Sequence, residues 1–422
     1  MNIMTKELIQ KSIYKDLSLA KEGHQKIAWV KRHMPILNAI ENRFQKEQPF
    51  KGKRIALSIH LEAKTAYLAQ MLASGGAEVH VTGSNPMSTK DYAVAALVDS
   101  GIATYAIHGA SKEAYEGFLK ATLKSEPHIV IDDGGDLVQE LHGDLAGYAT
   151  HVIGACEETT SGMLRAKARQ KSGALNFPVL AINDANCKYL FDNRYGTGQS
   201  TFDGIMRTTN LVVAGKTIII AGYGWCGKGC AMRAKGLGAK VVITEINPVK
   251  ALEAKMDGFD ILPMEQAAPL GDIFITATGC CEVLTPQHFA LMKQDAIVSN
   301  TGHFDKEIDI AGLTEMAIAT TESRANITTY TLPTKQQIHL LGKGALVNIA
   351  CADGHPAEIM DMSFALQALS AEYLLQQPLE NKVYEVPAAI DEKVAYLKLQ
   401  DLGVGIDVLT AQQVAYLNSY NL

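Results

Sequence analysis

The sequence has no excess of basic charge and no long uninterrupted apolar segment. Its 39 lysines and arginines are outnumbered by 45 aspartates and glutamates, and the formal net charge of −6 offers no positive field for nucleic acid. Apolar runs are interrupted early, as at Lys216, so no segment is long enough to cross a bilayer. The first residues also lack the apolar core of a signal peptide. We therefore expect a cytoplasmic protein that binds neither nucleic acid nor membrane.

Cysteines are few, and their spacing argues against two common roles. There are seven, an odd number, and no two stand in a Cys-x-x-Cys arrangement. Cys226 and Cys230 flank a glycine turn, whereas Cys280 and Cys281 are adjacent. This pattern favours reduced thiols over a disulfide framework or a zinc site. No metal is expected.

At 422 residues the chain is longer than one hydrophobic core usually organises, so two domains are expected. Short apolar runs alternate with helical stretches in two successive units. The expected strands are residues 54–59, 77–81, 102–106 and 128–131 in the first unit, and 216–220, 241–244, 273–277 and 296–299 in the second. Strands that are apolar throughout indicate parallel sheets covered on both faces. The predicted fold is α/β, with two doubly wound parallel-sheet domains packed together.

A glycine motif marks a dinucleotide site in the second unit. Gly222, Gly224 and Gly227 fit G-x-G-x-x-G, and the motif lies between a strand and a helical run, as that site requires. The first glycine permits the turn, the second admits the pyrophosphate and the third allows close packing of helix and strand. Glu245 stands 23 positions after Gly222, where a carboxylate can bind the ribose diol and repel a 2′-phosphate. The pattern favours NAD over NADP, although FAD and S-adenosylmethionine sites can share the motif.

Six segments, in this order, resemble the S-adenosylhomocysteine hydrolase family over nearly the whole chain. They are residues 132–136, 157–162, 188 with 191–193, 222–229, 300–305, and 348 with 354–356. The resemblance implies a substrate-binding domain of residues 1–193 and 352–385, an NAD-binding Rossmann domain of residues 194–351 and a C-terminal helical tail of residues 386–422. It also implies a deep cleft between the domains that holds the active site.

The resemblance implies a reversible reaction of the methyl cycle in one-carbon metabolism. Tightly held NAD⁺ would take a hydride from the 3′-carbon of S-adenosyl-L-homocysteine. The resulting ketone acidifies the 4′-hydrogen, so homocysteine can leave from the 5′-carbon. Water then adds, and the ketone is reduced again. Because NAD is regenerated, the net reaction is hydrolysis to adenosine and homocysteine.

The resemblance assigns a set of catalytic residues, namely His60, Asp133, Glu158, Lys188, Asp192, Asn193 and His303. Lys188 would take the proton of the 3′-hydroxyl, if a neighbour lowers its pKa or relays its proton. Asn193 would position this lysine, while Asp192 and Glu158 would accept hydrogen bonds from sugar hydroxyls. His60 and Asp133 would move protons at the 5′-carbon, and His303 would lie near the sugar and the nicotinamide. Taken singly, His60 is more simply a strand-end histidine and Lys188 a surface lysine.

The same resemblance implies two groups of binding residues. The cofactor-binding residues are Thr159, Thr160, Ser161, Gly222, Gly224, Gly227, Glu245, Thr278, Thr301, Gly302 and Asn348. The substrate-binding residues are Glu62, Lys64, Thr65, Asp353 and His355. The expected ligands are NAD and a nucleoside thioether, and the family suggests a homo-oligomer, either a dimer or a tetramer.

The sequence departs from the family pattern where the purine base would bind. The family commonly has a threonine and a glutamate or glutamine two and four positions after the first histidine, whereas here Glu62 and Lys64 follow His60. If Glu62 faces N1 and Lys64 faces the 6-position, the pair suits hypoxanthine, and S-inosyl-L-homocysteine becomes the alternative substrate. If the two side chains pair with each other, adenine is still accepted. Asp353 adds a further charge at a position where the family often has methionine.

Two other departures concern the cofactor. Thr197 stands where the family often has cysteine near the nicotinamide, so the redox tuning is expected to differ. The sequence also lacks the family's lysine- and tyrosine-bearing C-terminal extension, from which we expect weaker retention of NAD.

Two further hypotheses are a catalytically silent NAD-sensing regulatory homologue and an ordinary dehydrogenase that releases NADH. The joint presence of Lys188, Asp192, His60 and Asp133 argues against the silent homologue.

Overall fold

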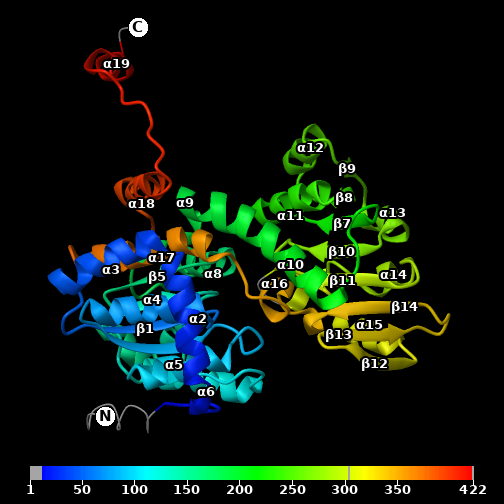
Figure 1. Ribbon diagram of the computed structural model, residues 1–422, viewed down its shortest axis with the longest axis horizontal. Coiled ribbons are helices and arrows are strands. Elements are labelled where there is room, and N and C mark those ends of the chain that lie inside the picture. The colour runs from blue at the N-terminus through cyan, green and yellow to red at the C-terminus, as the bar shows by residue number, and fades with distance from the viewer. Residues whose placement is uncertain (1–11, 303–304, 421–422) are drawn as a thin grey trace.

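The computed structural model describes residues 12–302 and 305–420 of the chain. Two α/β domains lie side by side, one built mainly from the N-terminal half and the other from the green and yellow segments of Figure 1. His303 and the first eleven residues lie outside the described part. The predicted α/β fold with two sheets of mainly parallel strands is confirmed.

The first sheet has seven strands in the order β15-β6-β5-β4-β1-β2-β3, and all its pairings are parallel. Its strands are β1 Arg54–Ile59, β2 Glu78–Gly83, β3 Ala103–Tyr105, β4 Ile129–Asp132, β5 Gly154–Glu157, β6 Val179–Ala181 and β15 Val383–Glu385. Strand β15 comes from near the C-terminus, so the chain returns to this domain after completing the second one.

The second sheet has eight strands in the order β12-β13-β14-β11-β10-β7-β8-β9. Its strands are β7 Thr217–Ala221, β8 Lys240–Thr244, β9 Asp260–Ile261, β10 Ile273–Thr276, β11 Ala296–Asn300, β12 Ala319–Arg324, β13 Ile327–Thr331 and β14 Gln337–Leu341. The strands from β14 to β9 pair in parallel, whereas β12, β13 and β14 form an antiparallel ribbon at one edge that the sequence did not predict.

Helices cover both sheets (Figure 1). In the first domain they are α2 Ala20–Arg32, α3 Pro35–Glu47, α4 Ala63–Ser74, α5 Asp91–Asp99, α6 Lys112–Leu123, α7 Asp136–Leu141, α8 Thr160–Ser172, α17 Ala357–Tyr373 and α18 Ala388–Asp401. In the second domain they are α11 Trp225–Gly236, α12 Pro248–Met256, α13 Met264–Ala267, α14 Pro286–Phe289, α15 Ile310–Met316 and α16 Val347–Ala350. Short 3-10 turns connect several of these elements.

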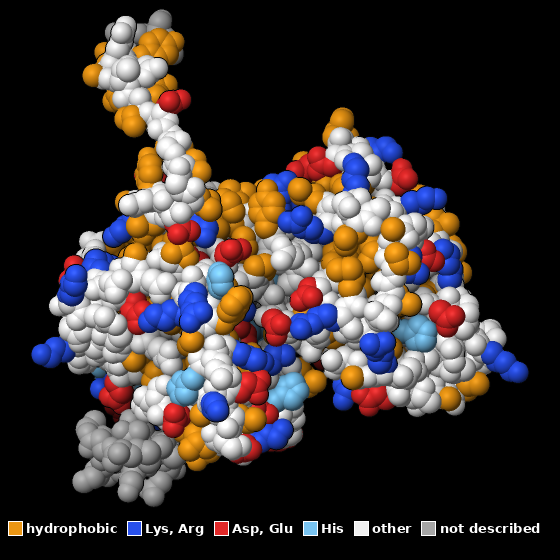
Figure 2. All heavy atoms as spheres, viewed as in Figure 1, with side chains coloured by type: hydrophobic (Ala, Val, Ile, Leu, Met, Phe, Trp, Pro, Cys, Tyr) orange, Lys and Arg blue, Asp and Glu red, His pale blue; other side chains and the backbone are white. Residues whose placement is uncertain are grey.

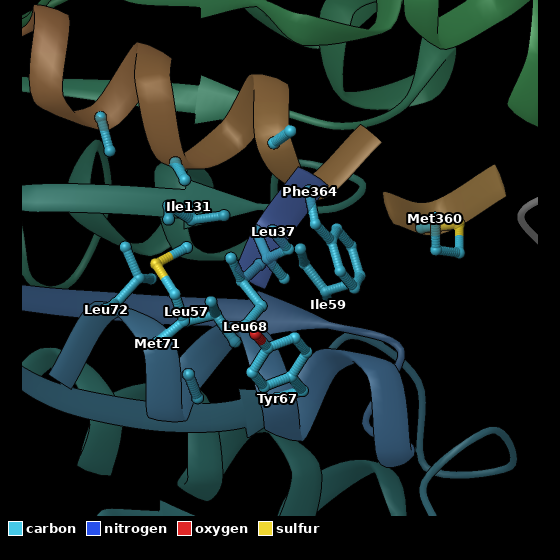
Figure 3. Packing of buried hydrophobic residues seen from close by; sticks show 14 of the residues in the cluster. Leu37, Leu57, Ile59, Tyr67, Leu68, Met71, Leu72, Ile131, Met360 and Phe364 are labelled. Carbon is cyan, nitrogen blue, oxygen red and sulfur yellow. The ribbon is translucent and has the colours of Figure 1, made fainter. Parts of the chain in front are cut away.

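The core of the first domain holds α17 in place. Residues 360–371 of this helix are all buried, because it lies between the sheet and helices α3 and α4. Figure 3 shows Phe364 of α17 near Leu37 of α3 and Ile59 of β1. A helix that is buried on every side carries few charges, so the polar residues that α17 does carry are informative.

A continuous helical run joins the two domains. It consists of α9 Asn186–Lys188, a π-helical segment η4 over Tyr189–Gly196, and α10 Thr197–Thr209. π-helical turns often occur at functional sites, because the extra residue in each turn re-aims side chains. Three of the expected catalytic residues, Lys188, Asp192 and Asn193, lie on α9 and this segment.

The C-terminal segment leaves the body of the molecule. After α18, residues 402–410 extend outward to α19 Ala411–Leu417, and residues 402–420 are exposed throughout (Figure 1). Among the described residues, no helix combines the length and the apolar character that crossing a membrane requires.

Candidate active site

Three expected catalytic residues follow neighbouring strands of the first sheet. His60 follows β1, Asp133 follows β4 and Glu158 follows β5, and these strands pair in that order. The carboxyl ends of parallel strands meet at one edge, which is where open α/β sheets bind ligands. The structure therefore brings the three side chains together at one edge.

His60 and Asp133 form a pair at this edge. His60 Nε2 lies 3.6 Å from Asp133 Oδ2, which also accepts a hydrogen bond of 3.0 Å from the Ser84 hydroxyl. His60 Nδ1 lies 2.7 Å from Ser88 Oγ, and the Ser88 hydroxyl donates to the carbonyl of Asn85. The Ser88 oxygen is therefore the acceptor for Nδ1–H. This leaves Nε2 as the nitrogen that can exchange a proton beside Asp133.

A second cluster surrounds Lys188, whose side chain is 4% exposed. Its Nζ donates to Asn193 Oδ1 at 3.0 Å and lies 3.5 Å from Asp192 Oδ1 and 3.9 Å from Glu158 Oε1. Within the described part of the chain, Glu158 Oε1 has no hydrogen-bond partner. A buried oxygen without a partner is costly, so this atom suits a substrate hydroxyl.

Burial and the two carboxyl groups set the charges in this cluster. Burial lowers the pKa of Lys188, but the carboxylates of Asp192 and Glu158 outweigh that effect, and the pKa of the lysine is raised. Burial raises the pKa of Glu158 to about 8, against the opposing effect of Lys188. For Asp192, Lys188 and His355 outweigh burial and lower the pKa. Asp192 is therefore the ionised partner of the lysine. From the sequence, Lys188 could remove the proton in two ways, namely through a lowered pKa or through a relay by a neighbour. The pKa of Lys188 is not lowered, so relay through a neighbour is the route that this cluster supports.

His355 connects Asp192 to the second domain. Its Nδ1 lies 3.1 Å from Asp192 Oδ1, and its Nε2 lies 3.2 Å from both Asn348 Nδ2 and Thr197 Oγ1. This arrangement makes Nδ1 the donor and Nε2 the acceptor. The ring of His355 thus holds the carboxylate of Asp192, and binding of substrate by His355 stays a prediction.

The glycine motif forms the turn between β7 and α11. Gly222 has φ +97°, which favours glycine, and a Cβ on Gly227 would lie 1.9 Å from the Gly222 carbonyl oxygen. A Cβ on Gly224 would meet nothing within 4 Å, so the space beside this residue is open. The first and third glycines are thus required by the turn itself, and the second faces the space expected for the pyrophosphate.

The turn also contacts the catalytic cluster. Cys226, inside the motif, accepts a hydrogen bond from Asn193 Nδ2 at 3.7 Å, and its sulfur lies 3.6 Å from Thr197 Oγ1. Asn193 is the residue that also holds Lys188 Nζ. The dinucleotide turn and the lysine cluster therefore form one site at the junction of the domains.

The residues around the turn fit a dinucleotide. The Glu245 carboxylate accepts hydrogen bonds from the N–H groups of Tyr223, Ile246 and Asn247, and these outweigh burial and lower its pKa. It is therefore ionised beside the turn, as recognition of a ribose diol requires. Asn348 Oδ1 and Thr301 Oγ1 are buried and have no hydrogen-bond partner within residues 12–302 and 305–420. Such atoms suit the amide and hydroxyl groups of a nicotinamide nucleotide.

Several other expected cofactor residues are engaged within the chain. Thr159 caps the N-terminus of α8, where its hydroxyl donates to Glu157 and accepts from the Gly162 N–H. The Thr160 hydroxyl donates to Asn183 at 3.3 Å, and Ser161 Oγ lies 3.1 Å from Thr159 Oγ1. Thr278 follows β10 and donates to Glu307, while Thr301 and Gly302 follow β11. Of these, Thr278, Thr301 and Gly302 lie at the carboxyl edge of the second sheet.

The expected purine-binding residues form an ion pair. Lys64 Nζ donates to Glu62 Oε2 at 2.8 Å and to the backbone carbonyl of Asp353 at 3.0 Å, and both side chains are less than 10% exposed. The Thr65 hydroxyl donates to the His60 carbonyl, and the Asp353 carboxylate lies 3.1 Å from Arg207. Mutual pairing of Glu62 and Lys64 is therefore the arrangement found.

The sequence interpretation missed polar residues that α17 supplies. The Ser363 hydroxyl donates to Asp192 Oδ2 at 3.1 Å, and Gln367 Nε2 donates to Glu158 Oε2. Ser363 and Gln367 are one turn apart on a helix whose buried residues are mostly apolar. Polar residues at helical spacing in such a helix were the available signal.

Comparisons with known proteins agree with this geometry. Residues 11–149 match the family model described as S-adenosyl-L-homocysteine hydrolase, and residues 193–354 match the model of that enzyme's NAD binding domain. The chain is 54% identical to S-inosyl-L-homocysteine hydrolase of Methanocaldococcus jannaschii, over 96% of this chain and 98% of the relative. It is 53% identical to adenosylhomocysteinase of Aquifex aeolicus, over 97% and 98%, and to that of Pyrococcus abyssi, over 96% and 97%.

The expected resemblance, fold class and cofactor are thereby confirmed. The two family models together match more than half of the chain, and each of these relatives aligns along almost all of it. The chain belongs to the S-adenosyl-L-homocysteine hydrolase family and is an NAD-dependent hydrolase.

Proposed function

We propose that this hydrolase cleaves S-adenosyl-L-homocysteine to adenosine and homocysteine, reversibly, through a 3′-keto sugar. The observation that carries the proposal is the buried Lys188 cluster, which is joined to the dinucleotide turn through Asn193 and Cys226. Bound NAD supplies a reversible hydride acceptor for the 3′-carbon. The same junction would place the sugar between the lysine cluster and the His60–Asp133 pair.

The residues of the Lys188 cluster would bind the sugar hydroxyls and deprotonate the 3′-hydroxyl. Lys188, held by Asn193, would place a positive charge beside the 3′-oxygen and so favour its deprotonation. The proton would pass to Asp192, the neighbouring carboxyl group that is ionised. Glu158 Oε1, which has no hydrogen-bond partner in the described chain, would bind a sugar hydroxyl.

The His60–Asp133 pair would serve the 5′-carbon. His60 Nε2 would give a proton to the departing thiolate and take one from the incoming water, while Asp133 stabilises the charged ring. The pair also has the buried hydroxyls of Ser84 and Ser88 beside it, which fix the orientation of the ring.

S-inosyl-L-homocysteine is a second candidate substrate, supported by the 54% identity to an S-inosyl-L-homocysteine hydrolase. The mutual pairing of Glu62 and Lys64 is the arrangement in which adenine is also accepted. An ammonium group has three donors, and Lys64 directs two of them at Glu62 and at the Asp353 carbonyl. The third donor would bind N1 of adenine or the 6-keto oxygen of hypoxanthine. We therefore propose that both bases are accepted, with a moderate preference that the pair determines.

The proposed domain roles follow the position of each cluster. Residues 1–193 and 352–385 would bind the nucleoside, residues 194–351 would bind NAD, and residues 386–422 would form the tail. We place the enzyme in the cytoplasm.

We also propose a homo-oligomer, dimer or tetramer, because the exposed tail carries apolar side chains that would pack on a second copy (Figure 2). Light scattering of the wild type and of Val408→Asp tests this assembly.

Thiol release from both thioethers, with enzyme of measured NAD content, tests the proposed reaction. Homocysteine should appear without net accumulation of NADH, which separates hydrolysis from an ordinary dehydrogenase. Lys188→Ala should lose reduction of the bound cofactor while it still binds adenosine. Steady release of NADH, or wild-type turnover by Lys188→Ala, would contradict the proposal.

A further inference from the structure

Two adjacent thiols lie outside the catalytic cluster, in the loop that follows β10. Cys280 and Cys281 are both exposed, whereas the chain's other five cysteines are buried or half-buried. Burial raises the pKa of each of those five thiols, Cys156, Cys187, Cys226, Cys230 and Cys351. Because the thiolate is the reactive form, a thiol reagent will meet the adjacent pair first.

The loop that carries this pair is also a wall of the dinucleotide turn. A Cβ on Gly222 would lie 2.8 Å from the Ala277 carbonyl oxygen and 3.2 Å from Thr278 Cγ2. Glu307 accepts hydrogen bonds from the backbone of Thr278 and Gly279 and so holds this wall in place. Any displacement of residues 277–279 therefore changes the space beside the first glycine of the motif.

Hydrogen bonds connect the cysteine pair to this wall on one side and to the body of the domain on the other. The Cys280 N–H donates to Thr278 Oγ1 at 3.1 Å. On the far side, the N–H groups of Glu282 and Val283 donate to the carbonyls of Lys306 and Glu307 at 2.8 Å. Glu307 thus anchors both sides of the pair, through its carboxylate on the Thr278 side and through its backbone carbonyl on the far side. A change in the geometry of Cys280 and Cys281 would therefore strain the hydrogen bonds that hold the wall in place.

Joining two neighbouring cysteines requires such a change. Consecutive Cα atoms across a trans peptide are about 3.8 Å apart, whereas cysteines in disulfides usually have Cα atoms roughly 4.4–6.8 Å apart. The backbone between Cys280 and Cys281 must therefore distort when the sulfurs bond. A strained, exposed disulfide is readily reduced again, which is the behaviour of a reversible site.

We propose that Cys280 and Cys281 form a vicinal dithiol that small disulfides of the glutathione type oxidise reversibly, and that oxidation weakens the binding of NAD. One thiolate attacks the small disulfide and releases one thiol, leaving a mixed disulfide. The neighbouring thiolate then attacks the protein sulfur and releases the second thiol. The pair loses two electrons and two protons, and the small disulfide gains both. The inference rests on the proposed contact of Thr278 with the cofactor.

Oxidised glutathione and intact-mass spectrometry of the full chain test the chemistry. The wild type should lose two hydrogens without retaining glutathione, whereas Cys280→Ser and Cys281→Ser should each stop at a mixed disulfide. Dithiothreitol should reverse both changes. Retention of glutathione by the wild type, or oxidation at another cysteine first, would overturn the inference.

The affinity for NAD tests the consequence. We expect the dissociation constant of the oxidised wild type to rise about tenfold, equivalent to about 1.4 kcal/mol. The double variant Cys280→Ser with Cys281→Ser should bind NAD like the reduced wild type, with or without oxidised glutathione. An internal disulfide that leaves NAD affinity unchanged would overturn the regulatory role. Because neither measurement uses turnover, their failure is separable from failure of the proposed hydrolysis.

Discussion

The carboxylate of Asp391 accepts hydrogen bonds from the backbone N–H groups of Asn186 and Cys187, both at 2.8 Å. Asp391 lies in the first turn of α18, more than 200 residues further along the chain, and it is buried. It satisfies the first two donors of α9, the short helix that ends at Lys188. Helix α18 thus fixes the backbone from which the proposed catalytic lysine projects.

Asp391→Ala should therefore slow oxidation of the sugar without abolishing cofactor binding. Removing a charged acceptor from buried N–H groups costs roughly 1.5–3 kcal/mol, and we expect a loss of about tenfold or more in the rate of cofactor reduction. Stopped-flow absorbance after adding adenosine to NAD-loaded enzyme measures this rate. Glu392→Ala, an exposed neighbour on the same helix, is the matched control. Equal rates for the two variants would show that Asp391 does not position the lysine.

The ion pair between Glu62 and Lys64 yields a prediction about the purine base. Replacing it by the pattern common in the family, with Glu62→Thr and Lys64→Gln together, removes both charges and so leaves neither one buried alone. We expect the ratio of kcat/KM for the inosyl over the adenosyl thioether to fall about ten- to several-hundred-fold. Steady-state assays with both substrates measure the ratio.

A single substitution at this pair should behave differently from the double variant. Lys64→Gln alone leaves Glu62 buried without its cation and should lower kcat/KM for both thioethers. If the double variant keeps the wild-type ratio of the two substrates, the pair does not contact the base edge.

Much of this architecture was accessible from local patterns, and the remainder depends on contacts between distant residues. The strand over residues 54–59 and the glycine turn were predicted because burial on both faces and the turn itself impose local residue choices. The antiparallel ribbon from β12 to β14 was missed, since β12 is exposed along its whole length and has no apolar run. The capping of α9 by Asp391 leaves no local trace, because its partners are more than 200 residues away.

Within the candidate active site, too, local patterns could be read from the sequence, whereas contacts between distant residues could not. The motif around Asp133 predicted a ligand-binding edge, and the other segments that resemble the family predicted which residues would lie beside it. The role of His355 could not be inferred from spacing, because its ring joins Asp192 of η4 to Asn348 of α16 only after the two domains have packed together.

The buried Glu158 predicts how stability depends on pH. Burial raises its folded-state pKa to about 8, whereas its pKa in the unfolded chain is about 4.3. Between these values the folded state binds more protons than the unfolded state, so stability is greatest below about pH 4.3 for this group and falls as pH rises through 8. Asp132, whose pKa burial raises to about 7, acts in the same direction.

Glu158→Gln, which resembles the protonated acid, should therefore reduce the fall in Tm between about pH 5 and pH 8. The difference should amount to a few degrees, since 1 kcal/mol moves Tm by roughly 2–4 °C in domains of 150–250 residues. Calorimetry across this range measures it. Glu113→Gln, at an exposed position, should leave the slope unchanged. A wild-type slope in Glu158→Gln would show that this carboxyl group is ionised at neutral pH.

The three glycines of the motif predict two different kinds of damage. Gly224 has φ −72° and open space around an added Cβ, so Gly224→Ala should fold with wild-type stability. Its methyl group would occupy the space expected for the pyrophosphate, and we expect NAD affinity to fall by about tenfold or more, or about 1.4 kcal/mol. Gly227→Ala would place its Cβ 1.9 Å from the Gly222 oxygen, so it should also lower Tm by displacing α11. Gly236→Ala, at the far end of α11 and also in open space, is the control for both. Calorimetry and titration with NAD separate the two effects, and an unchanged affinity in Gly224→Ala would remove the pyrophosphate from this turn.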